Sequence, residues 1–473
     1  MTGSSRVFWA TLALFLVTTR GVDTADAAVH LAEALAWVER GTGDLDLDPG
    51  GRWVPTRRQA GGLLFVGDDG RSRSAHPPGL ALLATPLAAV LSWRAGPSGD
   101  GALGSALQAY FAEPPAPSPP ALFAPVHRDP RGLAFLLLFP VGGALAAAWT
   151  WLSARRLGLS RPSAAVGVGL LVASPLSVYA GTAWPQVLAA ACWAGAACAA
   201  VRRPRPSAVG LGGAVALALL LRPEHALLVP LLALGLWAHR RGGPAPFDRP
   251  PTVPIAATLA SAVTVLALLA VLRPTAPGPG FVPGAILAGA RDLLVHPDGG
   301  LLWHAPFALV VLAGLTSIGA PLVRCLVLAV VPLLAVYGAW FDPRADLAYG
   351  PRFLVPVLPW MALGAAALWE GRRRARPILA GAGWVGAAVA LPAVVAWGGR
   401  LPPTDLAAAY QVAWAHLDDP AWVRAPAVGW CALAASLVAL AGLLEGGVTR
   451  VRRPSPATRS APARGASAGG SPP

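Results

Sequence analysis

Long apolar runs recur along almost the whole chain, and they restrict its fold more than any other feature. A run of about 20 apolar residues can cross a bilayer as a helix, and shorter runs can cross when long side chains flank them. Because backbone polar groups in lipid need partners within the protein, such runs favour α-helices. We therefore expect an all-α polytopic membrane protein with about twelve transmembrane helices. The expected spans are 7–19, 132–152, 163–180, 186–201, 207–221, 224–238, 252–272, 304–319, 325–340, 353–370, 377–397 and 426–444.

The composition supports a membrane protein. Hydrophobic residues make up 55% of the chain and charged residues only 13%, whereas soluble domains carry about 25% charged residues. No small-residue cleavage site follows the first apolar run, so we expect that run to remain as the first span. The cysteines lie within apolar runs and lack the spacing of metal ligands, so neither disulfides nor zinc is expected. They are Cys192, Cys198, Cys325 and Cys431.

The arginines favour one side of the membrane. If the N-terminus is cytoplasmic, the inner loops and the C-terminal tail carry 20 of the 37 basic residues but only three of the 23 acidic residues. Cytoplasmic loops of membrane proteins carry such an excess of arginine. We therefore expect both termini in the cytoplasm. The net charge of +14 then reflects topology, and we expect no nucleic-acid partner.

One apolar segment, at 79–93, is short and contains Pro86. Counting it as a span would move the arginines around 155–161 to the outer side, so we expect a helix lying on the outer leaflet instead. This helix then belongs to a first outer loop at about 20–131, and loops of such length are commonly functional. We expect one transmembrane domain at 1–445. The basic segment 446–473 is rich in Pro, Ser, Ala and Gly, and is expected to be a disordered cytoplasmic tail.

The first outer loop opens with a stripe of titratable residues. On a helix starting near Val22, the side chains of Asp23, Asp26, His30 and Glu33 follow three- and four-residue spacing and share one face. One interpretation is an amphipathic helix on the bilayer surface with a wet polar face. Another is an active site. The spacing of Asp26 and His30 also permits two metal ligands, although we expect neither a metal nor another cofactor.

Several motifs in order resemble a known family. They are "TTRGVDTADAAVHLAEAL", "DGRSRSAHPPGLALLATP", "LALLLRPEHALLVPLLAL", "LLVHPDGGLLWHAPFALVV" and "DLAYGPRFLVPVLP". Over roughly residues 7–370 they resemble the bacterial GT-C class of polytopic glycosyltransferases, which includes protein O-mannosyltransferases and lipid A aminoarabinose transferases. The resemblance implies an enzyme of the bacterial inner membrane. It would take a sugar from a polyprenyl-phosphate carrier on the extracytoplasmic face and pass it to an acceptor that the sequence does not identify.

The resemblance also implies a catalytic carboxylate just after the first span. It maps this role onto Asp26, with Asp23 as the second candidate, although relatives often have adjacent acids where this chain has spaced ones. The chemistry requires such a group, because an attacking hydroxyl must lose its proton and a carboxylate within about 3 Å can accept it.

Arginines are suited to the donor phosphate, because the guanidinium group forms paired hydrogen bonds with phosphate oxygens. Arg352 follows Gly350 and Pro351 where relatives have a similar Gly-Pro-Arg; a structural anchor is the alternative. Arg222 lies between two short apolar helices, where an arginine should face a polar cavity; the alternatives are that it pairs with Glu224 or extends its side chain to the membrane surface. The remaining candidate substrate-binding residues also have ordinary interpretations as turn, interface or surface residues. They are His76, Tyr349, Arg73, His296 and Asp298.

Two other functions remain open. A transporter or flippase of a lipid-linked or small substrate would place ionisable residues in mid-membrane and commonly has repeated halves. Here the acids lie in loops on one face and the two halves share no evident pattern, which favours chemistry at a membrane surface. A noncatalytic relative is the third interpretation, because the acidic motif is not an adjacent pair.

Overall fold

The computed structural model describes most of the helical part of the chain. The expected span at 426–444 and the expected tail at 446–473 lie outside the described residues. The described residues are 2–17, 19, 25–42, 44–45, 64–66, 72–74, 77–95, 130–202, 207–241, 252–272, 282–297, 299–340, 350–396 and 411.

The expected ranges from 7–19 to 377–397 all lie on helical segments. Four segments of the described part are long and apolar enough to cross a membrane by length and composition. The other ranges form shorter or interrupted helices, so the number of about twelve spans stays a prediction. The four segments are Pro130–Arg156, Pro321–Gly338, Arg352–Gly371 and Ala375–Val394.

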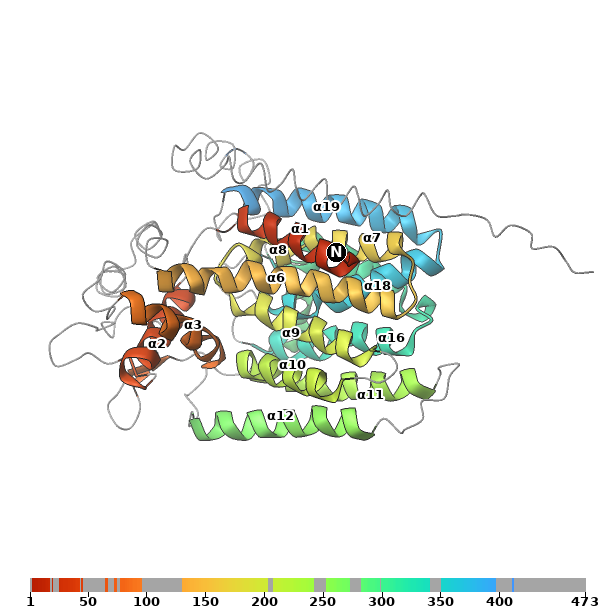
Figure 1. Cartoon of the computed structure of the whole chain (residues 1–473). Helices are drawn as coiled ribbons and strands as arrows, with labels where there is room; N and C mark the ends of the chain where they lie inside the picture. The colour runs from red at the N-terminus through yellow and green to blue at the C-terminus, as the bar shows by residue number, and fades with distance from the viewer. Residues whose placement is uncertain are drawn as a thin grey trace, which may run out of the picture.

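The first half of the chain supplies the elements from α1 to α9, labelled as in Figure 1. They are α1 (Gly3–Val17), α2 (Ala25–Arg40), β1 (Leu64–Val66), β2 (Ser72–Ser74), α3 (Gly79–Ala95), α6 (Pro130–Arg156), α7 (Arg161–Val172), α8 (Pro175–Ala180) and α9 (Pro185–Ala200).

The second half contains more interruptions, and short 3-10 helices (η) separate several α-helices. Its elements are α10 (Ala208–Leu221), η2 (Pro223–Leu227), α11 (Leu228–Arg241), α12 (Thr252–Leu272), η3 (Pro283–Ala285), α13 (Ile286–Val295), α14 (Leu301–His304), α15 (Pro306–Ala313), η4 (Leu315–Ser317), α16 (Pro321–Leu328), α17 (Val330–Gly338), η5 (Arg352–Val357), α18 (Leu358–Gly371) and α19 (Ala375–Ala396).

The described part of the chain is mostly helical, as expected, but the first loop contains a short β-hairpin that was not predicted. Strands β1 and β2 pair antiparallel, with Phe65 opposite Arg73. The intervening sequence, Gly-Asp-Asp-Gly-Arg, contains an Asp-Gly pair, which is typical of hairpin turns. A search for long apolar runs does not detect this signal, because the strands have only three residues each.

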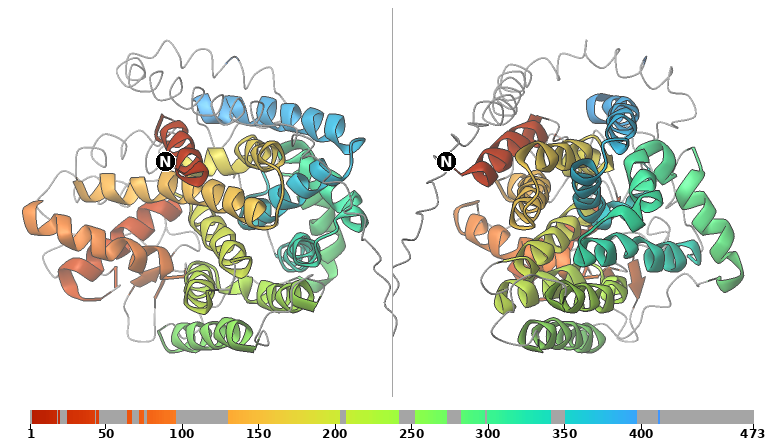
Figure 2. Two further views of the ribbon diagram at one scale, coloured as in Figure 1. Left: turned by 45° about the vertical axis from the view of Figure 1, so that its right-hand side comes forward. Right: turned by 90° about the vertical axis from the view of Figure 1, so that its right-hand side faces the viewer.

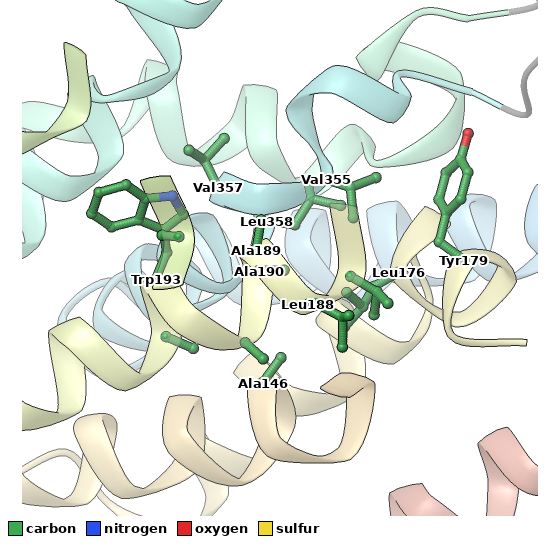
Figure 3. Packing of buried hydrophobic residues seen from close by; sticks show 14 of the residues in the cluster. Ala146, Leu176, Tyr179, Leu188, Ala189, Ala190, Trp193, Val355, Val357 and Leu358 are labelled. Carbon is green, nitrogen blue, oxygen red and sulfur yellow. The ribbon is translucent and has the colours of Figure 1, made fainter. Parts of the chain in front are cut away.

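Helix α9 lies at the centre of the bundle. Apart from Gln186 near its start, it is apolar on all sides, as expected for a helix buried on all sides. It packs between α6 and the η5–α18 segment (Figure 3): Leu188 lies near Ala146 on one side, and Trp193 faces Val357 and Leu358 on the other. Helices α12 and α19 lie at opposite sides of the bundle (Figure 2). Elements from both halves of the chain therefore pack on α9.

The bundle has two different ends (Figure 1). At one end, Arg156 donates to the carbonyl of Cys198 (2.7 Å), and Ser163 donates to Glu370. The C-terminal ends of α6, α9 and α18 lie together here, and we call this side of the bundle the arginine end. At the other end lie α2, α3 and the break between α10 and η2. We call it the site end.

Helix α3 fixes the first loop onto the site end. It begins at Gly79, directly after Pro77 and Pro78, as the Pro-Pro-Gly sequence predicts. A Cβ atom on Gly79 would lie 2.1 Å from the carbonyl oxygen of Leu220, so only glycine permits this approach to the end of α10. The helix expected at 79–93 is therefore present, although its position relative to a bilayer stays a prediction.

Candidate functional site

The first part of the candidate site is the break between α10 and η2. Arg222 is both the C-cap residue of α10 and the N-cap residue of η2. Pro223 follows it, and a proline cannot continue the α-helix. Its Nη1 lies 3.3 Å from Oε1 of Glu224. The hydroxyl of Tyr337 donates to the same oxygen at 2.8 Å. The pairing of Arg222 with Glu224 is therefore present, and the guanidinium retains further N–H donors, because an arginine has five.

The second part surrounds Arg352. Gly350 has a φ of 59°, which favours glycine, and Pro351 then leads into η5. The Cζ atom of Arg352 lies 4.7 Å from the ring centroid of Trp184 and 4.9 Å from that of Phe353. Two aromatic faces thus hold the guanidinium through cation–π contacts while its edge can still form hydrogen bonds.

Tyr337 and Phe353 connect the two arginines. Their rings stack with centroids 4.3 Å apart and an interplanar angle of 9°. Tyr337 bonds the partner of Arg222, and Phe353 lies under Arg352. We call Arg222, Glu224, Tyr337, Phe353, Arg352 and Trp184 the two-arginine cluster. It combines residues that are far apart in sequence into one partly buried site.

Other predicted residues lie next to this cluster. A Cβ atom on Gly350 would lie 2.9 Å from the ring of the buried His304, and one on Gly299 would lie 3.8 Å from the carbonyl of Gly350. The His-Pro-Asp-Gly-Gly stretch is therefore beside the Gly-Pro-Arg corner. His296 ends α13, and its carbonyl accepts from the amide of Gly300 at 2.7 Å. Asp298 and Tyr349 lie outside the described residues.

The Pro-Pro-Gly stretch meets the cluster from the other side, because Gly79 packs on the backbone immediately before Arg222. Arg73 lies in β2, a strand that is next to α2; only its backbone is described. His76 lies outside the described residues. The Pro-Pro-Gly stretch and strand β2 thus lie at the site end.

The acidic stripe lies partly in α2, which packs against α3. Asp26 is in the first turn of α2, and only its backbone is described; Asp23 lies outside the described residues. His30 and Glu33 are each 2% exposed. The interpretation of this face as wet therefore does not hold for these two residues, because α2 packs on α3 and their side chains are buried. Asp26 consequently begins a helix that is part of the packed site end.

Several members of the cluster were not predicted from the sequence as functional residues. Trp184, Tyr337 and Phe353 sit in apolar surroundings that carry no local signal of function. Within the described residues, no group of three or more His, Cys, Asp or Glu side chains is arranged to hold a metal ion. The chemistry that the described cluster supports is binding of an anion by two arginines supported by aromatic rings.

No family model and no curated protein matches the chain. The crystal structure of ArnT from Cupriavidus metallidurans bound to undecaprenyl phosphate is 16% identical, with a TM-score of 0.44, over 94% of this chain and 76% of that chain. Its apo structure is 15% identical, with a TM-score of 0.43, over 92% and 75%.

A third similar structure is the Archaeoglobus fulgidus oligosaccharyltransferase tethered with an acceptor peptide. It is 12% identical, with a TM-score of 0.41, and covers 90% of this chain and 55% of that chain. The GT-C class that the motifs resemble is therefore represented among the similar structures. At TM-scores below 0.5, this likeness assigns the chain no activity.

Proposed function

We propose that this protein is an integral membrane glycosyltransferase. It moves a sugar from a polyprenyl-phosphate carrier to an acceptor on the extracytoplasmic face, and Asp26 is the general base, with Asp23 as the second candidate. The observation that carries the proposal is the two-arginine cluster. Arg222 and Arg352 are 130 positions apart in the numbering, yet they are connected through Glu224, Tyr337 and Phe353 at the site end.

The arginines account for the leaving group. When the bond from the anomeric carbon to the phosphate breaks, negative charge increases on the phosphate oxygens. A fixed guanidinium stabilises that charge more than it stabilises the bound donor, and this difference lowers the barrier. Arg352 is held by two aromatic rings and Arg222 by a carboxylate. Both therefore keep their positions without rearrangement during the reaction.

The aspartate accounts for the nucleophile. A carboxylate accepts the proton of the acceptor hydroxyl as the new glycosidic bond forms. Helix α2 packs on α3, and Gly79 at the start of α3 touches the backbone just before Arg222. This chain of contacts supports a base on α2 near the phosphate-binding arginines. His76, Arg73, Tyr349, His296 and Asp298 are proposed to contact the sugar or the acceptor.

The distribution of charge supports the membrane orientation. The arginine end carries the arginines that precede α7 and follow α18, whereas the acidic α2 and the cluster lie at the opposite end. Under the positive-inside rule the arginine end is cytoplasmic. The cluster then opens toward the extracytoplasmic face, where a flipped lipid-linked sugar is presented.

Transfer of label tests the proposal. The purified full chain in liposomes is incubated with polyprenyl-phosphate sugars that carry a radiolabel, together with membrane extract as the source of acceptor. We expect label to appear on an acceptor. Movement of the labelled lipid across the bilayer without transfer would support a flippase instead, and neither transfer nor movement would favour a noncatalytic relative.

The base is tested with Asp26→Asn. Removal of a general base slows transfer by about a hundredfold to ten-thousandfold, whereas donor binding and thermal stability should remain. Asp292→Asn is the matched control: Asp292 lies on α13 and pairs with Arg291 at 3.2 Å, away from the cluster's described contacts. If Asp26→Asn transfers sugar at the wild-type rate, Asp26 is not the base, and Asp23→Asn is then the next variant.

A further inference from the structure

Three buried polar side chains around α9 have atoms without a hydrogen-bond partner. Gln186 is 1% exposed, and neither its Oε1 nor its Nε2 is bonded; Trp184 is 6% exposed, and its Nε1 is not bonded. His225 is fully buried, and its Nε2 is not bonded. Because buried polar groups are nearly always hydrogen-bonded, a group of them without partners suggests binding of a polar ligand.

The hydrogen bond from Trp193 fixes the protonation of His225. Nε1 of Trp193 donates to Nδ1 of His225 at 3.1 Å, so Nδ1 carries no proton. Since one nitrogen of a neutral imidazole must carry the proton, Nε2 of His225 is an N–H donor. Trp193 is itself held by Trp360, whose Nε1 donates to its carbonyl at 2.9 Å. His225 therefore presents one fixed donor.

Gln186 lies on the same face of α9 as Trp193. The two residues are seven apart, almost two full turns, and their Cα atoms are about 10 Å apart along the helix axis. Figure 3 shows Trp193 and Ala189 on the side of α9 that faces Val357 and Leu358. This is the η5 side, and η5 begins with Arg352, which lies over Trp184.

The three residues thus border the same elements. Trp184 contacts Arg352, and His225 follows Glu224, which pairs with Arg222. The Trp193–His225 hydrogen bond joins α9 to η2, and the contact of Trp184 with Arg352 joins the start of α9 to η5, so the three polar side chains lie on elements that adjoin the two-arginine cluster. The phosphate end of a donor bound by the arginines would point its sugar toward Gln186 and His225.

The chemistry of these groups identifies the kind of sugar. Trp184 and His225 each supply one N–H donor, while the Gln186 amide supplies two donors and a carbonyl acceptor. Glu224, the carboxylate that precedes His225 in the sequence, is engaged by Arg222 and Tyr337. Hydroxyl oxygens accept from such donors and a hydroxyl can donate to the amide, but an ammonium group would add a cation next to two arginines.

We propose that Gln186, His225 and Trp184 bind the sugar of the donor and select a neutral, hydroxylated sugar over an amino sugar. This inference rests on the proposed glycosyltransferase function. It adds a specificity to that function, because the arginines bind the carrier phosphate whatever sugar is attached, whereas Gln186 and His225 contact only the sugar and Trp184 both supports Arg352 through its ring and offers Nε1 to the sugar.

Binding measurements with three carriers test this inference. The full chain in nanodiscs is titrated with undecaprenyl phosphate, undecaprenyl-phosphate glucose and undecaprenyl-phosphate glucosamine, the last two differing by one hydroxyl-to-ammonium replacement. We expect the glucose carrier to bind about tenfold more tightly than the bare phosphate. The glucosamine carrier should show no such gain. Equal gains for both sugars would overturn the proposed selectivity.

Two variants of Gln186 make the test specific. Gln186→Leu keeps the volume and removes the amide, so the gain from glucose should disappear while binding of bare undecaprenyl phosphate is unchanged. Gln186→Glu supplies a carboxylate, so the glucosamine carrier should now bind about tenfold more tightly than in the wild type. If Gln186→Leu keeps the glucose gain and only raises Tm, the residue is a core residue and the inference is wrong.

The outcomes also separate this inference from the proposed function. If the protein transfers labelled sugar but Gln186→Leu binds all three carriers as the wild type does, only the inference fails. If no carrier binds and no label is transferred, the glycosyltransferase proposal fails and the inference fails with it. A loss of bare undecaprenyl phosphate binding in Gln186→Leu would contradict the assignment of this residue to the sugar.

Discussion

The two ends of the bundle use arginine in different ways. At the arginine end, Arg376 donates to the carbonyl of Trp369 at 3.0 Å and lies 5.9 Å from its ring centroid. At the site end, Arg352 lies 4.7 Å from the ring of Trp184, but it also belongs to a cluster with a second arginine. Both contacts join an arginine to a tryptophan, but the tryptophan under Arg352 is buried and its Nε1 has no hydrogen-bond partner.

The carboxylates show the same contrast. Glu370 accepts hydrogen bonds from Ser160 and Ser163, and these bonds close the short turn between α6 and α7 onto α18. Glu224 accepts from Arg222 and Tyr337 at a break between helices. The carboxylate at the arginine end joins a turn to the end of a helix, whereas the one at the site end lies at a helix break beside Arg222. The two ends therefore differ in what their carboxylates hold in place: a helix end in one case and an arginine in the other.

Among the comparisons between the two ends, the largest effect is expected from removing the charge of Arg352. Arg352→Gln should lower transfer by about a hundredfold to a thousandfold, because a fixed donor to the developing phosphate charge is lost. Labelled transfer and the Kd for undecaprenyl phosphate are measured together. Arg376→Gln is the matched variant at the arginine end, and it should transfer sugar at close to the wild-type rate. Equal losses in both variants would remove the functional distinction between the two ends.

A smaller effect is expected from adding a methyl group at Gly79, where α3 approaches the backbone of α10. In Gly79→Ala the new Cβ would meet the carbonyl of Leu220, and α3 would have to shift, at a cost of about 1–3 kcal/mol in the free energy of unfolding. Both Tm and transfer should fall, since α2 moves with α3. Denaturation followed by fluorescence, with transfer measured in parallel, checks this.

Gly213→Ala is the control on α10, because no atom lies within 4 Å of a Cβ placed there. Alanine in this helix should be neutral or stabilising by up to about 1 kcal/mol. If Gly79→Ala behaves like Gly213→Ala, the approach of α3 to α10 does not hold the first loop in place.

The sequence predicts much of this arrangement because many of its signals are local. The apolar runs predict the helices, Pro-Pro-Gly predicts the start of α3, and Arg-Pro-Glu predicts the break after α10. The pairing of Arg222 with Glu224 was one of the alternatives that the sequence offered, since the residues are two positions apart. Each of these features is determined within a few residues, by backbone conformation or by short-range charge.

Other features depend on segments that are distant in sequence. Nothing near Tyr337 indicates that its hydroxyl reaches Glu224, which lies 113 residues away. The spacing of His30 and Glu33 predicts a shared face, but not that this face is buried. In the sequence, Trp184 and Gln186 look like ordinary residues of an apolar helix, and only the packing of η5 on α9 shows that this helix adjoins the segment that begins with Arg352. Local patterns thus predicted the motifs, whereas the residues that contact these motifs from distant segments could be identified only from the tertiary structure.

The smallest effect compares two hydroxyls that each donate to a carboxylate. Tyr337→Phe removes the donor to Glu224 and keeps the ring stacked on Phe353, while Ser163→Ala removes a donor to Glu370. Each should lower the free energy of unfolding by about 1 kcal/mol, because another donor still holds each carboxylate. Only Tyr337→Phe should also slow transfer, by several-fold, since Glu224 then restrains Arg222 less firmly.

A double variant makes this comparison sharper. If Glu224 acts by orienting Arg222, then Tyr337→Phe should cost less in transfer when Arg222 is already glutamine than when it is present, because residues in one network are not additive. Ser163→Ala should cost the same stability in either background, since Glu370 lies at the arginine end. Additive effects of Tyr337→Phe and Arg222→Gln on transfer would show that the tyrosine hydroxyl does not act through the arginine, and the two ends would then differ in composition alone.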